Sequence, residues 1–134
     1  MCGTKVVCAE GDCGACTVVL GEAHRDDAGH ERIKYRAINS CIRLAHSIDG
    51  MALWTTEDLV SPEGQLHPTQ QALAECHGSQ CGFCTPGMIM SVRQLLKQHS
   101  DPTEDDIRHN LTGNICRCTG YHNIVRAVES LAAG

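Results

Sequence analysis

The spacing of hydrophobic and polar positions changes once along the chain, near residue 60. Before this point the pattern favours strands: Thr17–Leu20 is a short apolar run rich in β-branched residues. Residues 32–39 alternate between apolar and charged positions, which is typical of a half-buried strand. The polar residues 21–31 between these segments predict a surface loop, and residues 51–55 predict one further strand.

Beyond a cluster of helix-breaking residues at positions 61–65, the apolar positions recur at helical spacing. The first predicted helix ends at Gly78, and the second begins with Thr85 as N-cap and Pro86 in the first helical position. A third begins in the acid-rich turn at residues 103–106, and a fourth follows near the C-terminus. The pattern therefore predicts an α+β protein with a β-rich unit at residues 1–60 and a helical unit at residues 61–134.

The amino-acid composition indicates that these small units need a disulfide or a bound metal to be stable. The chain has 134 residues, of which one is Trp, two are Tyr and one is Phe. Small lobes with so few large side chains usually depend on a disulfide or a metal for stability. The ten cysteines are the residues that can supply such a staple.

Eight of the ten cysteines fall into two groups of four. The first group has the spacing C-x4-C-x2-C, which is typical of plant-type ferredoxins that bind a 2Fe–2S cluster, and a fourth cysteine follows the predicted strand at residues 32–39. The second group consists of a C-x2-C pair, a helical interval and a C-x-C pair. We therefore interpret the chain as a carrier of two 2Fe–2S clusters. The expected metal ligands are Cys8, Cys13, Cys16 and Cys41 for the first site and Cys81, Cys84, Cys116 and Cys118 for the second.

The same cysteines could also bind zinc, form disulfides or belong to a Rieske centre. A structural zinc ion fits the second group better than the first, because C-x2-C with a distant cysteine pair is a common zinc pattern. Disulfides are disfavoured because no secretory signal is visible and the close pairs suit metal ligands better. A Rieske centre lacks its histidines, and the eight histidines are scattered as solvated or capping residues. Cys76 is expected in the core, while Cys2 carries no signal.

The charge and hydropathy of the chain exclude several classes of partner. A formal net charge of −5 without a basic stripe argues against nucleic acid. No apolar run reaches the length of a membrane span, and a cytoplasmic location is expected. Because no nucleophile–base pair stands out, the chain is expected to transfer electrons and to carry out no substrate chemistry by itself.

Four motifs in order resemble the iron–sulfur subunit of molybdenum hydroxylases, the family of xanthine dehydrogenase, aldehyde oxidoreductase and aerobic CO dehydrogenase. They are residues 8–18 (CAEGDCGACTV), 39–41 (NSC), 77–87 (HGSQCGFCTPG) and 113–121 (GNICRCTGY). Residues 35–39 and 76–80 look most like the small subunit of bacterial xanthine dehydrogenase, whereas residues 121–125 look closer to the CO dehydrogenase branch. The resemblance covers nearly the whole chain.

This resemblance implies a ferredoxin-like β-grasp lobe followed by a four-helix lobe. It implies that electrons pass from a molybdopterin (Mo) centre in a large subunit, through both clusters, to FAD in a medium subunit of a xanthine dehydrogenase-like oxidoreductase. In the family, the positions of Gln80 and Cys118 lie against the pterin. The alternatives are a CO dehydrogenase- or aldehyde oxidoreductase-type subunit, a free-standing two-cluster ferredoxin or redox sensor, and a zinc-stapled interaction module.

The chain departs from the family pattern at its N-terminus. Only seven residues precede Cys8, whereas family members carry a longer segment that forms a hairpin of the β-grasp core. We therefore expect a truncated β-grasp lobe, whose sheet has an exposed edge and an exposed apolar face.

Overall fold

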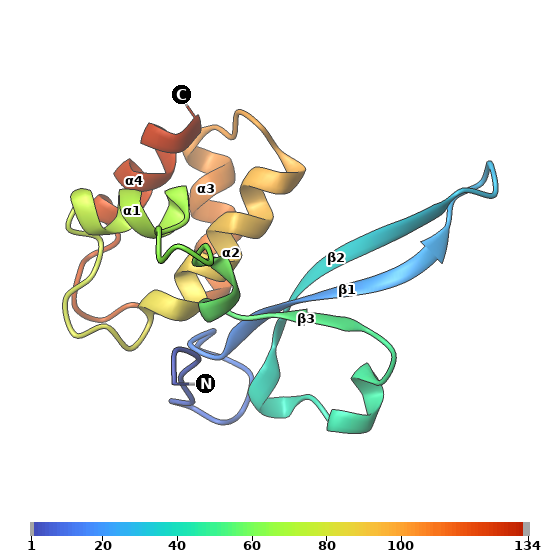
Figure 1. Cartoon of the computed structure of the whole chain (residues 1–134). Helices are drawn as coiled ribbons and strands as arrows, with labels where there is room; N and C mark the ends of the chain where they lie inside the picture. Colours follow the sequence, from blue (N-terminus) through green and yellow to red (C-terminus); the bar gives the residue numbers. More distant parts are fainter. Residues whose placement is uncertain (1, 133–134) are drawn as a thin grey trace.

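A computed structural model describes residues 2–132 and places a three-stranded sheet beside four α-helices in this range (Figure 1). The α+β class predicted from the sequence is confirmed. None of the described helices has the length and hydrophobicity needed to cross a lipid bilayer. The strands are β1 (Thr17–Arg25), β2 (Glu31–Asn39) and β3 (Ala52–Trp54); the helices are α1 (Pro68–Glu75), α2 (Thr85–Gln98), α3 (Glu104–Asn110) and α4 (His122–Ala132).

The sheet has the order β2-β1-β3, and both pairings are antiparallel. Strand β1 pairs with β2 along its whole length, from Thr17 opposite Asn39 to Arg25 opposite Glu31. The predicted loop over residues 21–31 is therefore confirmed only for residues 26–30, and the prediction was wrong for residues 21–25 and 31, which belong to the strands. The polar residues of this stretch lie on a two-stranded ribbon that extends into solvent away from the helices, where cross-strand pairs such as Arg36 with Glu22 replace apolar burial (Figure 1).

The hydrophobic core lies between the helices and the end of the sheet that contains the first residues of β1. Residues 17–21 of β1 are buried, whereas residues 23–25 are exposed. Val19, which is fully buried, joins the core formed by the helices, and α2 lies between the sheet and the other helices. The helix α2 contributes Met88, Met90, Val92 and Leu95 to this core, and α4 contributes Ile124, Val125 and Val128.

Two helix starts agree with the sequence and one is shifted. Thr103 caps α3 through a capping box with Asp106, as predicted. His67 caps α1 in the same way, a role that the sequence did not assign to this histidine in particular. Helix α2, however, begins at Thr85 with Cys84 as its N-cap, one residue before the predicted position. The Cys84 backbone already has helical angles, and Pro86 is tolerated because it lies in the first turn.

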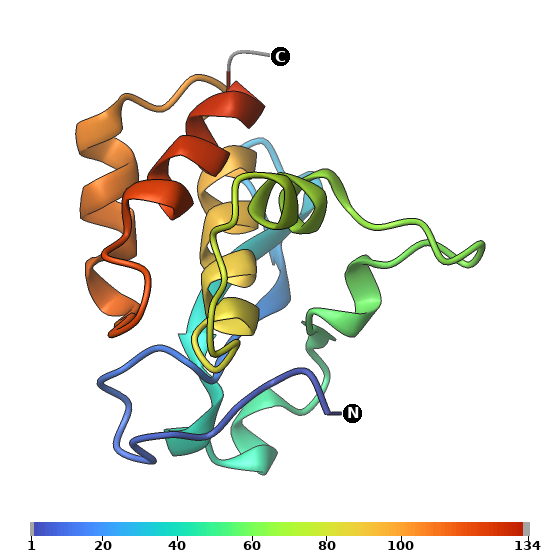
Figure 2. The same ribbon diagram turned by 90° about the vertical axis from the view of Figure 1, so that its left-hand side faces the viewer.

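The N-terminal loop crosses beneath the N-terminal end of α2 (Figure 2). This contact requires glycine on both sides. A Cβ atom on Gly87 would lie 2.1 Å from the carbonyl oxygen of Gly14, and Gly14 itself has a φ of +69°. The two glycines therefore let the loop that carries Cys13 and Cys16 lie directly against the helix that begins after Cys84.

Candidate metal centres

The first cysteine quartet forms two pairs. Cys8 and Cys13 are joined by a hydrogen bond in which the Cys13 N–H donates to the Cys8 Sγ at 3.4 Å, and their side chains also interact. The Cys41 N–H likewise donates to the Cys16 Sγ at 3.5 Å, and these two thiols contact each other. The short turn that follows β2 therefore carries Cys41 back to the end of the N-terminal loop, where Cys16 is buried at the start of β1.

The backbone around the first quartet favours thiolate at Cys8. The N–H groups of Cys13, Glu10 and Asp12 lower the pKa of the Cys8 thiol to about 6. The neighbouring Cys16 thiol, with burial, raises the pKa of Cys41 above its usual range. The site thus presents sulfur atoms that differ in how readily they lose a proton.

The second quartet also forms two pairs, and they do not follow the order of the sequence. Cys81 contacts Cys118, and Cys84 contacts Cys116, so each C-x2-C cysteine meets a C-x-C cysteine from the other loop. Cys81 and Cys118 are exposed, whereas Cys84 and Cys116 are buried. The loop after α1 and the loop before α4 therefore face each other with an outer and an inner pair of sulfur atoms.

Each pair in the second quartet contains one thiol with a lowered pKa and one with a raised pKa. The N–H of Phe83, together with the Cys118 side chain, lowers the pKa of Cys81, while contact with Cys81 raises that of Cys118. Burial raises the pKa of Cys84 to about 12. Burial also acts to raise the pKa of Cys116, but hydrogen bonds from the Thr119 hydroxyl and N–H leave it lowered.

This paired arrangement distinguishes between a single metal ion and a two-iron cluster. A structural zinc ion is held by four ligands around one point. A 2Fe–2S cluster needs four thiolates divided between two irons, so two separate pairs of cysteines per site match it better. The donor set therefore fits a 2Fe–2S cluster in both places.

The two quartets are joined through a short stretch of backbone. The Ile115 N–H donates to the carbonyl oxygen of Cys13 at 2.9 Å, and Ile115 directly precedes Cys116. Next to it, the buried Asn114 side chain donates to the Gly14 carbonyl oxygen at 3.0 Å and accepts from the Ser91 hydroxyl at 2.7 Å. The loop of the first quartet is thus fixed to the loop of the second.

A cavity of about 200 Å³ opens at this junction. All four cysteines of the second quartet line it, and Cys13 of the first quartet lines it as well. The lining also includes three exposed apolar side chains, Val7, Phe83 and Ile115. One side chain of the first quartet therefore borders the space around the second.

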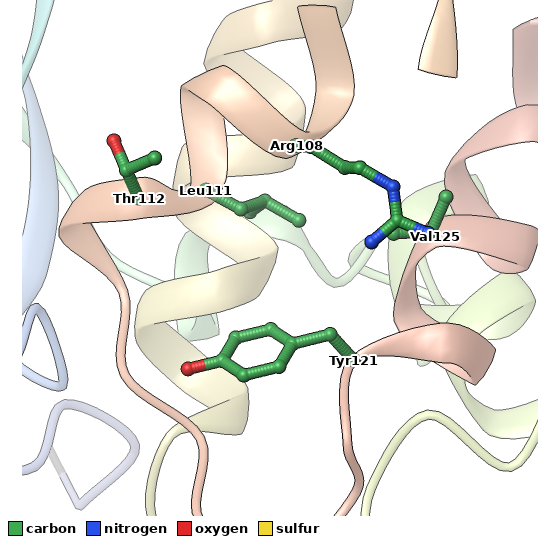
Figure 3. Close-up of a pocket in the computed structure, with 5 residues that line it drawn as sticks. All are labelled: Arg108, Leu111, Thr112, Tyr121 and Val125. Atoms are coloured by element: carbon green, nitrogen blue, oxygen red, sulfur yellow. The ribbon is translucent and has the colours of Figure 1, made fainter. Parts of the chain in front are cut away.

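Tyr121 contacts the second quartet through the backbone of Cys116. Its hydroxyl oxygen accepts the Cys116 N–H at 2.7 Å, and its backbone has a φ of +66°, which is unusual for a residue other than glycine. Its ring lines a cavity of about 210 Å³ between α3 and α4, where Leu111 faces the same space and Arg108 extends across it (Figure 3). Neither Tyr121 nor Asn114 was predicted as a site residue, although both lie in the motif at residues 113–121.

Gln80 lies in the loop before Cys81 and is exposed, as is Cys118. Both residues that the family resemblance places against a pterin are therefore on the surface beside the outer pair of the second quartet.

Comparisons with known proteins identify the family. A family model described as a 2Fe-2S binding domain matches residues 55–129. The chain belongs to the 2Fe-2S binding domain family. This match confirms the prediction of iron–sulfur chemistry made from the cysteine spacing, and it favours that chemistry over a zinc-stapled module.

Individual relatives of this 2Fe-2S protein agree. It is 45% identical over 130 residues to the xanthine dehydrogenase of Drosophila pseudoobscura pseudoobscura, which covers 97% of this chain and 10% of that protein. Quinoline 2-oxidoreductase from Pseudomonas putida 86 has a TM-score of 0.82 and 35% identity over 98% of this chain and 72% of that chain. Aldehyde oxidoreductase from Desulfovibrio gigas has a TM-score of 0.81 and 39% identity over 98% of this chain and 13% of that chain.

The predicted resemblance to molybdenum hydroxylases is therefore confirmed, and the chain corresponds to their iron–sulfur region. The relatives include both xanthine dehydrogenase and aldehyde oxidoreductase, so the similarity is compatible with either type. The chain spans about a tenth of the length of the curated relatives it matches.

Proposed function

We propose that the chain is an electron-transfer unit that holds two 2Fe–2S clusters and relays electrons between a molybdopterin centre and FAD on partner domains or subunits. The observation that carries this proposal is the arrangement of the eight cysteines in four pairs, with Cys13 of one site bordering the cavity of the other. Two redox sites this closely linked suit a relay.

The proposed ligands of the first cluster are Cys8 and Cys13 on one iron and Cys16 and Cys41 on the other. Those of the second are Cys81 with Cys118 and Cys84 with Cys116. When bound, each cluster supplies a one-electron redox centre. The chain provides thiolates at fixed positions, with N–H groups donating to the sulfur atoms of proposed ligands that include Cys8, Cys16 and Cys116.

We propose that the second site faces the molybdopterin centre, with Gln80 and Cys118 closest to the pterin. The support is the exposed surface around Cys81 and Cys118. Phe83 is 57% exposed, Val7 58% and Ile115 49%, and such a concentration of apolar side chains marks a surface that a partner covers. Electrons would then leave through the first site toward FAD.

The division into a ferredoxin-like unit at residues 1–60 and a helical unit at residues 61–134 remains part of this proposal. The match to the 2Fe-2S binding domain begins at residue 55, close to that boundary. We also propose a cytoplasmic location, because a reducing compartment keeps cysteine thiols available as metal ligands. The substrate reaction would take place on the molybdenum-bearing partner.

The partners are tested by purification from the source cells. An affinity-tagged chain expressed at its native level should retain molybdenum and FAD, which are measured by elemental analysis and by absorption of the released flavin. A free-standing ferredoxin would be purified with iron but without either cofactor. That result would contradict the proposed relay between partners while leaving the clusters themselves in place.

A further inference from the structure

A separate cavity of about 330 Å³ lies between α1, α2 and α4, the group of helices that Figure 2 shows together. It borders the C-terminal half of α2, whereas Cys84 precedes the N-terminus of that helix. Nine residues separate Cys84 from Arg93, which is about 13 Å along a helix axis. The cavity is therefore outside the cysteine sites. Its lining includes Arg93, Lys97, His67 and Ser100.

Arg93 has charged hydrogen-bond donors that lack acceptors. Its Nε and Nη1 atoms are buried and form no hydrogen bond among the described residues. Neither Arg93 nor Lys97 forms an ion pair with an acidic side chain anywhere in residues 2–132. Arg93 as a residue is only partly buried, and it also lines the cavity. Because charged donors without acceptors are costly, this guanidinium is expected to meet an anion where it borders the cavity.

The other polar groups around the cavity reinforce its positive character. The Lys97 side chain lines the cavity, and its Nζ stands 5.2 Å from the centroid of the Tyr35 ring on β2. Burial, and then the charges of Arg93 and Lys97, lower the pKa of His67. The His67 Nδ1 accepts the Thr69 N–H at 3.2 Å, so the neutral ring carries its proton on Nε2 and adds a donor. Arg93 and Lys97 thus form a local positive site on a chain whose net charge is −5.

We propose that this cavity binds a phosphate group, with Arg93 as its principal partner and Lys97 and Ser100 as further donors. A phosphate carries up to two negative charges and three strong acceptor oxygens, so it can meet donors from several directions at once. The site accepts either free phosphate or the phosphate of an organic monoester. Pro68, Leu96 and Leu131, which also line the cavity, offer an apolar wall for the organic part of a monoester.

The test uses the full chain with its clusters and three probes: inorganic phosphate, adenosine monophosphate and adenosine. Binding is measured by calorimetry, and melting is followed at matched ionic strength. Phosphate and the monoester should bind and raise the melting temperature, whereas adenosine should not. Tighter binding of the monoester would identify an organic phosphate as the ligand, and equal or weaker binding would identify free phosphate.

Arg93→Gln should weaken phosphate binding about tenfold or more, because it removes a charge-assisted hydrogen bond. Arg93→Lys retains the charge and should lose less affinity, which separates the loss of charge from a failure to fold. Arg126→Gln, an exposed arginine of α4 outside the cavity lining, is the matched control and should bind like the parent chain. Equal binding by the parent chain and Arg93→Gln, or no binding by either, would overturn the proposal.

Discussion

Replacing Gly87 with alanine is expected to lower the melting temperature of the chain by about 4 to 12 °C, the shift that corresponds to overpacking by about 1 to 3 kcal/mol in a domain of this size. The added Cβ would lie 2.1 Å from the Gly14 carbonyl oxygen and 3.2 Å from the carbonyl carbon of Ala15. Both are backbone atoms of the loop that carries the first cysteines. Relief of the clash must therefore move the loop or the helix, despite the gain that alanine usually brings inside a helix.

Gly113→Ala is the matched control for this substitution. A Cβ atom at this position would meet no atom within 4 Å, and its backbone is outside the left-handed region. Its melting temperature should stay close to that of the parent chain or rise slightly. Thermal unfolding under anaerobic conditions, followed by circular dichroism, compares the two variants. A Gly87→Ala chain that melts with the parent would show that the loop and α2 are not in close contact.

Replacing Cys84 with serine is expected to halve the iron content, from about four atoms per chain to about two. Cys84 belongs to the buried inner pair, and serine cannot replace its thiolate as an equivalent ligand to iron. The first site does not use Cys84, so its signal should persist in the electron paramagnetic resonance spectrum of the reduced protein. Cys16→Ser should give the reciprocal result, with loss of the first signal and retention of the second.

Cys76→Ser provides the control for a generic effect of losing a thiol. Cys76 is half-buried against the core but belongs to neither quartet, so this variant should keep about four irons. The account would be contradicted if Cys84→Ser kept all its iron. It would also be contradicted if Cys76→Ser lost as much iron as Cys84→Ser.

Much of the fold was predictable because local chemistry determines it. The capping box at Thr103 is a short-range signal, and the structure contains it as the sequence suggests. The first quartet could be recognised because the C-x4-C-x2-C spacing is typical of a 2Fe–2S site, whereas the spacing of the second quartet is shared with zinc sites. Strand β2 was predicted almost entirely, at residues 32–39, whereas the extension of β1 over residues 21–25 was missed because this segment is mostly polar and has no clear apolar alternation. Strand pairing there depends on cross-strand contacts that a single segment does not reveal.

The pairing of the cysteines within each site could not be predicted from their spacing in the sequence. Neighbours in the sequence suggested that Cys81 and Cys84 act together, but Cys84 is drawn inward as the N-cap of α2 while Cys81 remains outside. Each therefore meets a partner from the loop before α4. The role of Asn114 was likewise hidden, because its hydrogen bond to Gly14 spans 100 residues of sequence.

The central claim is that this chain holds two 2Fe–2S clusters. Anaerobic purification followed by iron analysis and electron paramagnetic resonance of the dithionite-reduced chain tests it most directly. The account predicts about four irons per chain and two distinguishable 2Fe–2S signals, one for each quartet. Stoichiometric zinc without iron, or a single signal from a chain with about two irons, would contradict it.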